Sequence, residues 1–180
     1  MPGYLSYNPF GLKIDTNELS FETWEKVAEV TVSAATAQVN LTGLDGDNDQ
    51  VYMLFIRAKN ADGANNNALY VRLNNDSGTN YNRRWLRTDG SNVNVRADTG
   101  VNSPFIGTMP AGGIAFCTVF IFATSGQKRM IISLENGQQS GICTVEWTNT
   151  ADNVTQLNIV GGGTNSIDAG TKIILFRKTS

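Results

Sequence analysis

The sequence predicts an all-β domain, an antiparallel β-sandwich of the jelly-roll type with an extended N-terminal arm. Three observations support this prediction. Apolar and polar residues alternate in short runs, which is the pattern of half-buried strands. Asn-Gly and Asp-Gly pairs lie between the runs, and such pairs turn the chain sharply because they tolerate positive φ. No stretch has a convincing helical period. The 180 residues suffice for one domain with a proper core and are too few for two comfortable ones.

Residues 1–22 are predicted to form the arm. Proline and glycine interrupt regular structure there, and aromatic residues are spread between them. An arm that cannot form its own core usually packs on something else, and Tyr4, Tyr7 and Phe10 are the expected docking residues. The alternative is a disordered tail. Residues 23–180 are predicted to form the jelly-roll domain.

About nine or ten short strands are expected in this domain, at the regular spacing of a sandwich or barrel. They fall at 24–32, 37–41, 51–58, 69–73, 81–87 with a continuation to 95, 114–123, 128–135, 142–148, 154–160 and 172–178. The run 51–58 is apolar apart from Arg57, which suits a strand that is buried on both faces. The run 81–87 is expected to be the return strand of a hairpin.

Strand parity also predicts parts of the core. Phe116 or Phe120, Val145 and Leu157 are the expected inner-face residues, and parity leaves open whether Phe116 or Val119 points inward. Trp24 and Trp147 lie in apolar-periodic strands, so both are expected in the core, whereas Trp85 follows two arginines and is expected to be exposed. Cys117 and Cys143 share the inward parity, and buried free thiols are expected unless their strands are adjacent.

Composition excludes several classes of function. The net charge is −2 and the pI about 5.1, without the basic excess of a nucleic-acid-binding protein. No apolar run is long enough to insert into a membrane, and no signal peptide is recognisable, so synthesis in a cytoplasm is expected. Histidine is absent, which removes the commonest general base and zinc ligand. We therefore expect no enzyme, no catalytic residue and no cofactor.

Two groups of acidic residues could in principle bind a metal or catalyse hydrolysis. Asp45, Asp47 and Asp49 have the alternate spacing of a calcium loop but lack the glycine and glutamate that a helix-loop-helix site requires. We predict no metal site, although a looser calcium site on this turn stays open. Glu135 and Glu146 are expected to face outward, as two surface glutamates rather than the carboxylate pair of a glycosidase.

A basic spot is expected near residues 81–87. Arg83, Arg84, Arg87 and Arg96 could lie beside aromatic residues and hold a single-stranded nucleic acid, a sugar or an acidic partner. A solvated strand face is favoured by the acidic pI. If the site binds a glycan, the expected contacts are Tyr81, Arg84 and Trp85.

Three segments go beyond generic strand patterning. They are 41–47 (LTGLDGD) leading into 51–54 (VYML), 71–81 (VRLNNDSGTNY) followed by Arg83 and Arg84, and 169–176 (AGTKIILF). Together they resemble jelly-roll domains in structural proteins of tailed bacteriophages, which occur in capsid decoration proteins, head fibres and tail fibres. The resemblance covers roughly residues 23–178 and contributes no catalytic residue.

The resemblance implies a virion structural protein, made in the host cytoplasm and often a homotrimer. The chain has no shaft-like repeat, so a capsid decoration (cement) protein or head-fibre component is favoured over a long fibre. Its expected partners are the major capsid protein or a tail protein, and further copies of itself in a symmetric oligomer. The alternative is a receptor-binding tail-fibre domain or carbohydrate-binding module that contacts a host-surface glycan.

Overall fold

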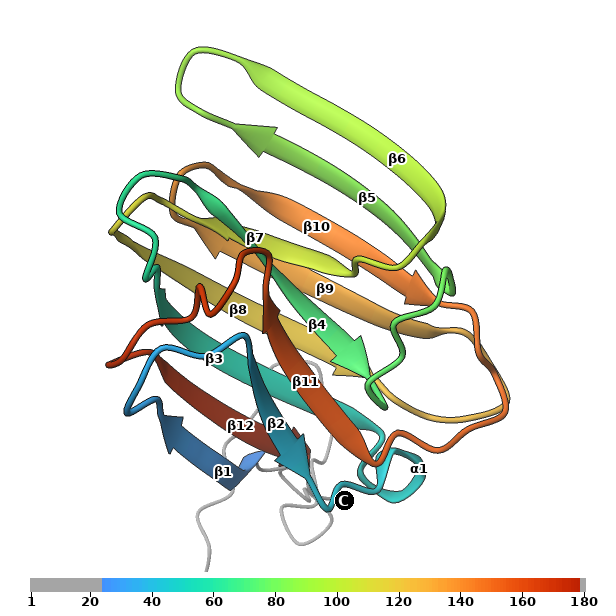
Figure 1. Cartoon of the computed structure of the whole chain (residues 1–180). Helices are drawn as coiled ribbons and strands as arrows, with labels where there is room; N and C mark the ends of the chain where they lie inside the picture. The colour runs from blue at the N-terminus through green and yellow to red at the C-terminus, as the bar shows by residue number, and fades with distance from the viewer. Residues whose placement is uncertain (1–23, 179–180) are drawn as a thin grey trace, which may run out of the picture.

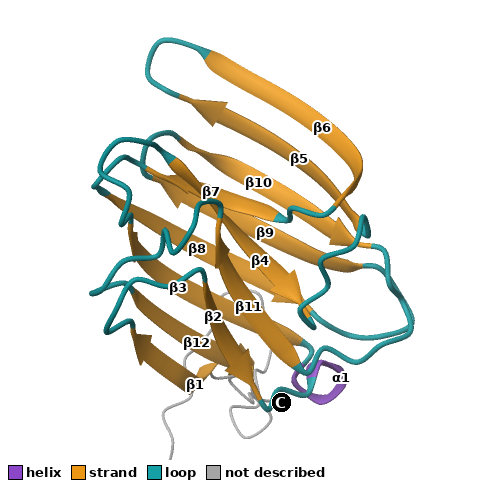
Figure 2. Cartoon of the chain, in the orientation of Figure 1, coloured by secondary structure: helices purple, strands orange, loops and turns teal. Residues whose placement is uncertain are grey.

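Two antiparallel sheets pack face to face in the computed structural model, which describes residues 24–178 (Figure 1). One sheet has eight strands and the other has four. A single short helix, α1 (Gly46–Asp49), interrupts the strands and loops of the described chain (Figure 2). The prediction of an all-β antiparallel sandwich of jelly-roll type is therefore confirmed. The predicted arm, residues 1–22, lies outside the described residues.

The larger sheet contains the strands that begin and end the described chain. In spatial order its strands are β1 (Trp24–Thr31), β12 (Lys172–Lys178), β3 (Val51–Lys59), β8 (Ile114–Phe122), β9 (Arg129–Asn136), β10 (Ser140–Trp147), β5 (Tyr81–Thr88) and β6 (Val93–Val101). The smaller sheet consists of β2 (Gln38–Thr42), β11 (Gln156–Gly161), β4 (Asn67–Leu73) and β7 (Phe105–Met109). Strand β7 was not predicted, because its five residues lie between two prolines and do not alternate.

The run 81–87, expected as the return strand of a hairpin, does not pair with the strand before it. Strand β4 belongs to the smaller sheet, whereas β5 pairs with β6 and β10 in the larger one. The chain crosses between the sheets at Asn74 and Asn75, whose φ angles of 53° and 55° are left-handed. The crossing is held by Asp76, whose carboxylate accepts a hydrogen bond from the Trp147 indole Nε1 at 2.6 Å.

The core lies between the two sheets. Inward residues of the large sheet meet those of the small one, and all of the following are buried: Leu54, Ile56, Val119, Ile121, Ile131, Val145 and Trp147 from the large sheet, and Leu69, Val71, Leu73, Leu157 and Ile159 from the small one. The predictions for Val145, Leu157 and Trp147 are confirmed.

Two core predictions are wrong. Phe116 is 56% exposed and Val119 is fully buried, so parity places Val119 inward and Phe116 on the outer face of the large sheet. Phe120 shares that outer face and is half-buried. Trp24 is 41% exposed, at the edge strand β1, where its ring meets the Phe120 ring edge-on.

A buried arginine closes one end of the sandwich. Arg129 is fully buried, and its guanidinium donates hydrogen bonds to the backbone carbonyl oxygens of Ala123, Gln127, Asn149 and Asp152. It also lies 5.3 Å from the centroid of the Trp147 ring. Because a guanidinium carries five donors in a planar fork, one side chain can tie together the loops before β9 and after β10.

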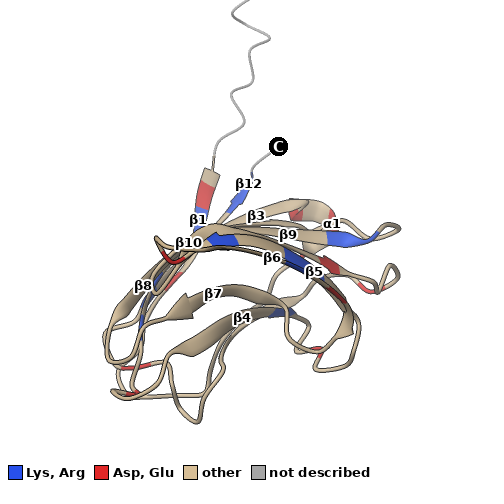
Figure 3. Ribbon diagram, turned by 90° about the horizontal axis from the view of Figure 1, so that it is seen from above, with Lys and Arg blue, Asp and Glu red and all other residues tan. Residues whose placement is uncertain are grey.

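The large sheet is wider than the small sheet that covers it. Seen from above, it curves over the smaller sheet (Figure 3). In Figure 1 the β5–β6 hairpin lies beyond the strands of the small sheet. The large sheet therefore has an inner face that is partly covered and an outer face that no described residue covers.

Neighbouring residues of β11 provide a test of the assigned core. Ile159 is fully buried and Val160 is half-buried on the opposite face. Ile159→Ala should lower the free energy of unfolding by about 2–5 kcal/mol, because it leaves a cavity, whereas Val160→Ala should cost less than about 1 kcal/mol. Urea denaturation of both variants measures the difference. Equal losses would contradict the assigned orientation of β11.

Candidate functional site

The outer face of the large sheet presents rows of apolar side chains. Cross-strand pairing aligns one residue from each of the eight strands in a single row, in the order Glu29, Ile174, Phe55, Thr118, Leu134, Ile142, Leu86 and Val95. The neighbouring row contains Phe176, Met53, Phe120, Ile132 and Thr144 in its middle. Because side chains alternate along a strand, both rows point away from the core.

This outer face is also where the exposed large apolar residues gather. In residues 24–178 they all belong to the large sheet: Trp24, Val27, Phe55, Leu86, Val93, Val95, Phe116, Phe122, Met130, Leu134 and Ile142. None belongs to the small sheet. We call the central group the apolar patch, defined as Phe55, Leu86, Phe116, Phe122, Met130, Leu134 and Ile142.

Charged residues flank the apolar patch. The outward positions of the two central strands β8 and β9 carry no charge. On one side, Glu29 pairs with Lys26 at 2.8 Å and with Lys172 at 2.7 Å. At another margin, Glu146 of β10 lies beside Met130 in the cross-strand register, 3.5 Å from Lys128 and 4.0 Å from Arg84. An apolar centre within a rim of mixed charge is the usual anatomy of a protein–protein interface.

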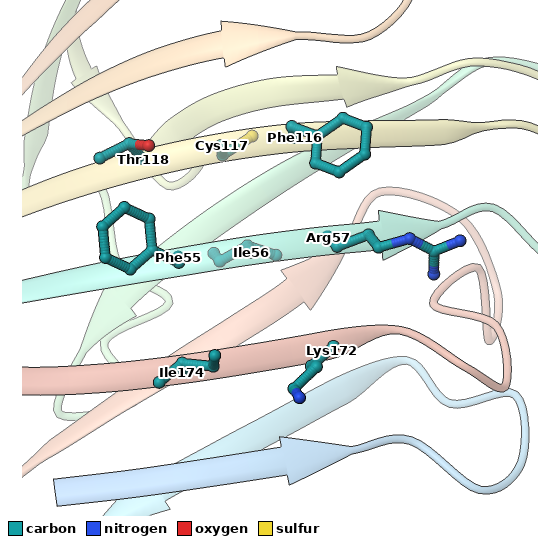
Figure 4. A pocket seen from close by; sticks show the side chains of 8 residues that line it. All are labelled: Phe55, Ile56, Arg57, Phe116, Cys117, Thr118, Lys172 and Ile174. Carbon is teal, nitrogen blue, oxygen red and sulfur yellow. The ribbon is translucent and has the colours of Figure 1, made fainter. Parts of the chain in front are cut away.

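A shallow hollow lies within the apolar patch, between β12, β3 and β8. Its lining includes the rings of Phe55 and Phe116, the Thr118 side chain and the cations Arg57 and Lys172. Figure 4 shows the two rings on either side of the hollow. Lys172 is already paired with Glu29, and the Arg57 guanidinium donates to the Gly170 carbonyl oxygen at 3.2 Å.

The predicted glycan contacts do not form one site. Tyr81 is fully buried, and its hydroxyl accepts a hydrogen bond from the Leu73 N–H at 3.1 Å. Arg84 is exposed on the outer face beside Glu146, whereas Trp85, the next residue, points to the inner face. Tyr81 cannot reach a ligand from its buried position, and the other two residues lie on opposite sides of the sheet.

Trp85 is instead part of a stack on the inner face of the β5–β6 hairpin. The Arg83 and Arg96 guanidiniums lie 4.9 Å and 5.3 Å from its ring centroid, and the Phe105 ring lies 5.5 Å away. Both arginines also donate to the Asp98 carboxylate, and these hydrogen bonds lower the pKa of Asp98. The predicted basic spot is thus internally paired and links the hairpin to β7.

Glu135 faces inward, contrary to the expectation of an outward surface glutamate. It is 5% exposed, its carboxylate accepts a hydrogen bond from Arg87, and it accepts another from the Thr108 N–H at 2.9 Å. Burial raises the pKa of this carboxyl more than Arg87 lowers it. A raised folded-state pKa means that the free energy of unfolding falls as the pH rises from the unfolded-state pKa through the folded-state one. Glu146 lies on the outer face, as predicted.

The buried ion pair of Arg87 and Glu135 lies where β7 packs on the large sheet. Gly107 of β7 approaches so closely that an added Cβ would lie 2.7 Å from the Cys117 Sγ and 3.1 Å from a Glu135 carboxylate oxygen. The Arg87 guanidinium covers the Phe105 ring at 4.5 Å. Within residues 24–178 the hydrogen-bond partners of Glu135 are Arg87, the Thr108 N–H and the Cys143 thiol, and the arrangement holds two layers together.

The two cysteines are free and buried, as predicted. They lie in β8 and β10, which are separated by β9, so their strands are not adjacent. Strands two positions apart are about 9–10 Å apart, beyond the reach of a disulfide.

The aspartates of the predicted calcium turn point to different partners. Asp45 caps α1 and accepts from the Asn153 side chain at 2.9 Å, Asp47 accepts from the Ser125 N–H at 2.5 Å, and the Asp49 carboxylate accepts from the Tyr52 hydroxyl at 2.7 Å. In the part of the chain that the structure describes, no cluster of Cys, Asp and Glu could hold a metal ion. The same part contains no helix able to cross a membrane.

Of the predicted site residues, Tyr4, Tyr7 and Phe10 lie outside the described residues. The outer-face role of Phe55, Leu134 and Ile142 was not predicted from the sequence. A signal for it was present, since the run 51–58 and the uncharged run 114–123 place apolar residues at both parities. Such runs are typical of strands that are covered on both faces.

No family model matches the chain, and no curated protein matches it. Two solved structures are similar in fold. One is the alginate lyase Aly36B, at 15% identity and a TM-score of 0.39, with 83% of this chain and 78% of that chain covered. The other is the galectin LEC-6 of Caenorhabditis elegans, at 13% identity and a TM-score of 0.35, with 84% of this chain and 96% of that chain covered.

The Arg87–Glu135 pair gives a prediction about stability. Arg87→Ala should lower the free energy of unfolding by about 3–5 kcal/mol, because it leaves the Glu135 carboxylate buried without its partner. The double change Arg87→Met with Glu135→Leu should recover most of this loss, since two apolar groups of similar volume leave no charge unpaired. Chemical denaturation of the three proteins measures both effects. A double variant as unstable as Arg87→Ala would contradict this account.

The cysteines give a prediction about reactivity. Burial, followed by the nearby Glu135 charge, raises the pKa of both Cys117 and Cys143 to about 12. Because the thiolate is the reactive form, neither thiol should react with a disulfide reagent at pH 8 in the folded protein. Both should react within the mixing time in denaturant. Rapid labelling of either cysteine in the native state would contradict the buried placement.

Proposed function

We propose that this chain is a non-enzymatic structural protein of a tailed-phage virion, a capsid decoration or head-fibre component that assembles as a symmetric oligomer on the particle surface. The observation that carries the proposal is the apolar patch on the outer face of the large sheet. Its seven side chains are 38% to 56% exposed. A contiguous patch of this kind with a polar rim is typical of a surface that binds another protein.

The segments that resemble phage proteins support the same proposal. Residues 41–47 join β2 of the small sheet to α1, ahead of β3 in the large sheet. Residues 71–81 include another crossing, from β4 of the small sheet to β5 of the large sheet. Both segments therefore shape the turns that pass between the layers, and the phage resemblance rests on the way this sandwich is connected.

The receptor-binding alternative has less support. Its predicted contacts are a buried tyrosine and two residues on opposite faces of the sheet. The hollow beside Phe55 and Phe116 is open and shallow, and its two cations already have partners. A protein that binds host cells and blocks phage adsorption would favour this alternative.

Purified phage particles provide the test. The protein should be present in gradient-purified virions in many copies, in a fixed ratio to the major capsid protein. Removing residues 1–22, which contain Tyr4, Tyr7 and Phe10, should strongly reduce the occupancy of the protein on the particle. The far-ultraviolet circular dichroism spectrum of the β-sandwich should stay unchanged. Quantitative mass spectrometry of heads and tails, separated after disruption, measures the copy number of the full chain and the occupancy of the truncated one. Absence from the particles would refute the proposed function, and full occupancy of the truncated chain would refute docking by the arm.

A further inference from the structure

We infer that the outer face of the large sheet is the surface through which copies of this chain bind one another. The inference rests on the proposed function, and deepens it by naming the partner and the residues of the contact. The alternative occupants of the face are residues 1–23 of the same chain and another virion protein.

The first argument is the extent of apolar surface. With about 200 Å² for a fully exposed large apolar side chain, the seven residues of the apolar patch leave roughly 600 Å² in water. A standard interface buries about 800 Å² from each partner, whereas the largest apolar patch of a typical monomer is about 300–600 Å². The patch alone thus supplies most of the area that a stable contact needs, before its rim is counted.

The second argument is the reversed polarity of β9. Its inward residues include the polar Ser133 and Glu135 as well as Arg129, whereas Met130, Ile132 and Leu134 point outward. The inward polar groups are satisfied, since Ser133 Oγ donates to the Ile106 carbonyl oxygen at 2.7 Å and Glu135 pairs with Arg87. Strands in sheets that are covered on both faces have apolar residues on both, so the apolar outer face of β9 points to a cover in the functional state.

The third argument is that the apolar patch can meet a copy of itself. Its residues belong to β3, β8, β9, β10 and β5, so β9 is the middle strand of the patch. If two copies pack face to face about an axis that is parallel to the strands and lies over β9, the apolar patch of one copy lies over that of the other, and the contact is the same for both copies.

The test begins with the mass of the purified protein. Light scattering after gel filtration at micromolar concentration should give a multiple of the 19.5 kDa chain mass. Leu134→Arg, at the centre of the patch, should weaken self-association at least about 100-fold, because it buries an unpaired charge in the contact. Thr42→Arg is the matched control, since Thr42 is an exposed strand residue of the small sheet, and it should leave the mass unchanged.

A labelling experiment covers the case in which Leu134→Arg fails to fold. Cys117 and Cys143 are buried, so an introduced surface cysteine is the accessible thiol. Leu134→Cys should react with a maleimide much more slowly than Thr42→Cys at high protein concentration, and at a similar rate after dilution below the dissociation constant.

Three results would overturn the inference, and a fourth would separate it from the proposed function. If the wild-type protein is monomeric and the thiol of the Leu134→Cys variant is still protected, the same chain covers the face. Deletion of residues 1–23 from that variant would then make the thiol reactive. A monomer with a fully reactive thiol would leave the face to another virion protein. A folded Leu134→Arg variant that remains oligomeric would place the contact elsewhere. A self-associating protein that is absent from virions would refute the proposed function and leave this inference standing.

Discussion

The four-stranded sheet is too narrow to cover the inner face of the eight-stranded sheet, and this difference in width determines much of the structure. The small sheet provides the core over the middle of the large sheet, where Leu54, Val119 and Ile131 are fully or almost fully buried. Beyond its edge, the inner face of the β5–β6 hairpin needs another cover. The stack of Trp85 with Arg83, Arg96 and Phe105 provides it, using cation–π and ring contacts where the core uses aliphatic packing. The outer face has no such cover among the described residues, and it is there that the apolar side chains remain in water.

The buried pair of Arg87 and Glu135 occupies the junction between these regions. Removing two charges from water is costly, and their attraction repays this cost only when the remaining hydrogen-bonding groups are satisfied. Here the carboxylate also accepts from the Thr108 N–H, and the Arg87 guanidinium also donates to the Thr108 hydroxyl. The same pair thus fixes the position of β7 relative to β9 and β5. A purely apolar seam would allow the short strand β7 more freedom to shift its register, because hydrophobic packing is less directional than hydrogen bonding.

Much of the fold could be predicted from the sequence because strand alternation and Asn-Gly or Asp-Gly turns are local signals. The strand regions, the inward parity of the cysteines and the burial of Val145, Leu157 and Trp147 all followed from them. Errors arose where tertiary partners decide the outcome. Glu135 points inward because Arg87, on another strand, meets it there, and no local pattern reveals that partner. Phe116 and Trp24 are exposed because their strands have apolar residues on both faces, so parity alone could not identify the inner one. The candidate site was missed for the same reason, since Phe116 was an expected core residue and the outer face of its strand was not considered as a surface.

The absence of a bond between Cys117 and Cys143 would have a consequence under the proposed function, in which the protein leaves the cell on a particle. Such a protein folds in a reducing compartment and then works in an oxidising one. A stability that depended on a disulfide would change at lysis, and an accessible thiol would invite cross-linking between particles. Here both sulfurs are buried in strands that flank β9 and cannot pair. A change between reducing and oxidising surroundings should therefore leave the bonding of these two sulfurs unchanged, so that under the proposed function the same folded state would serve before and after release.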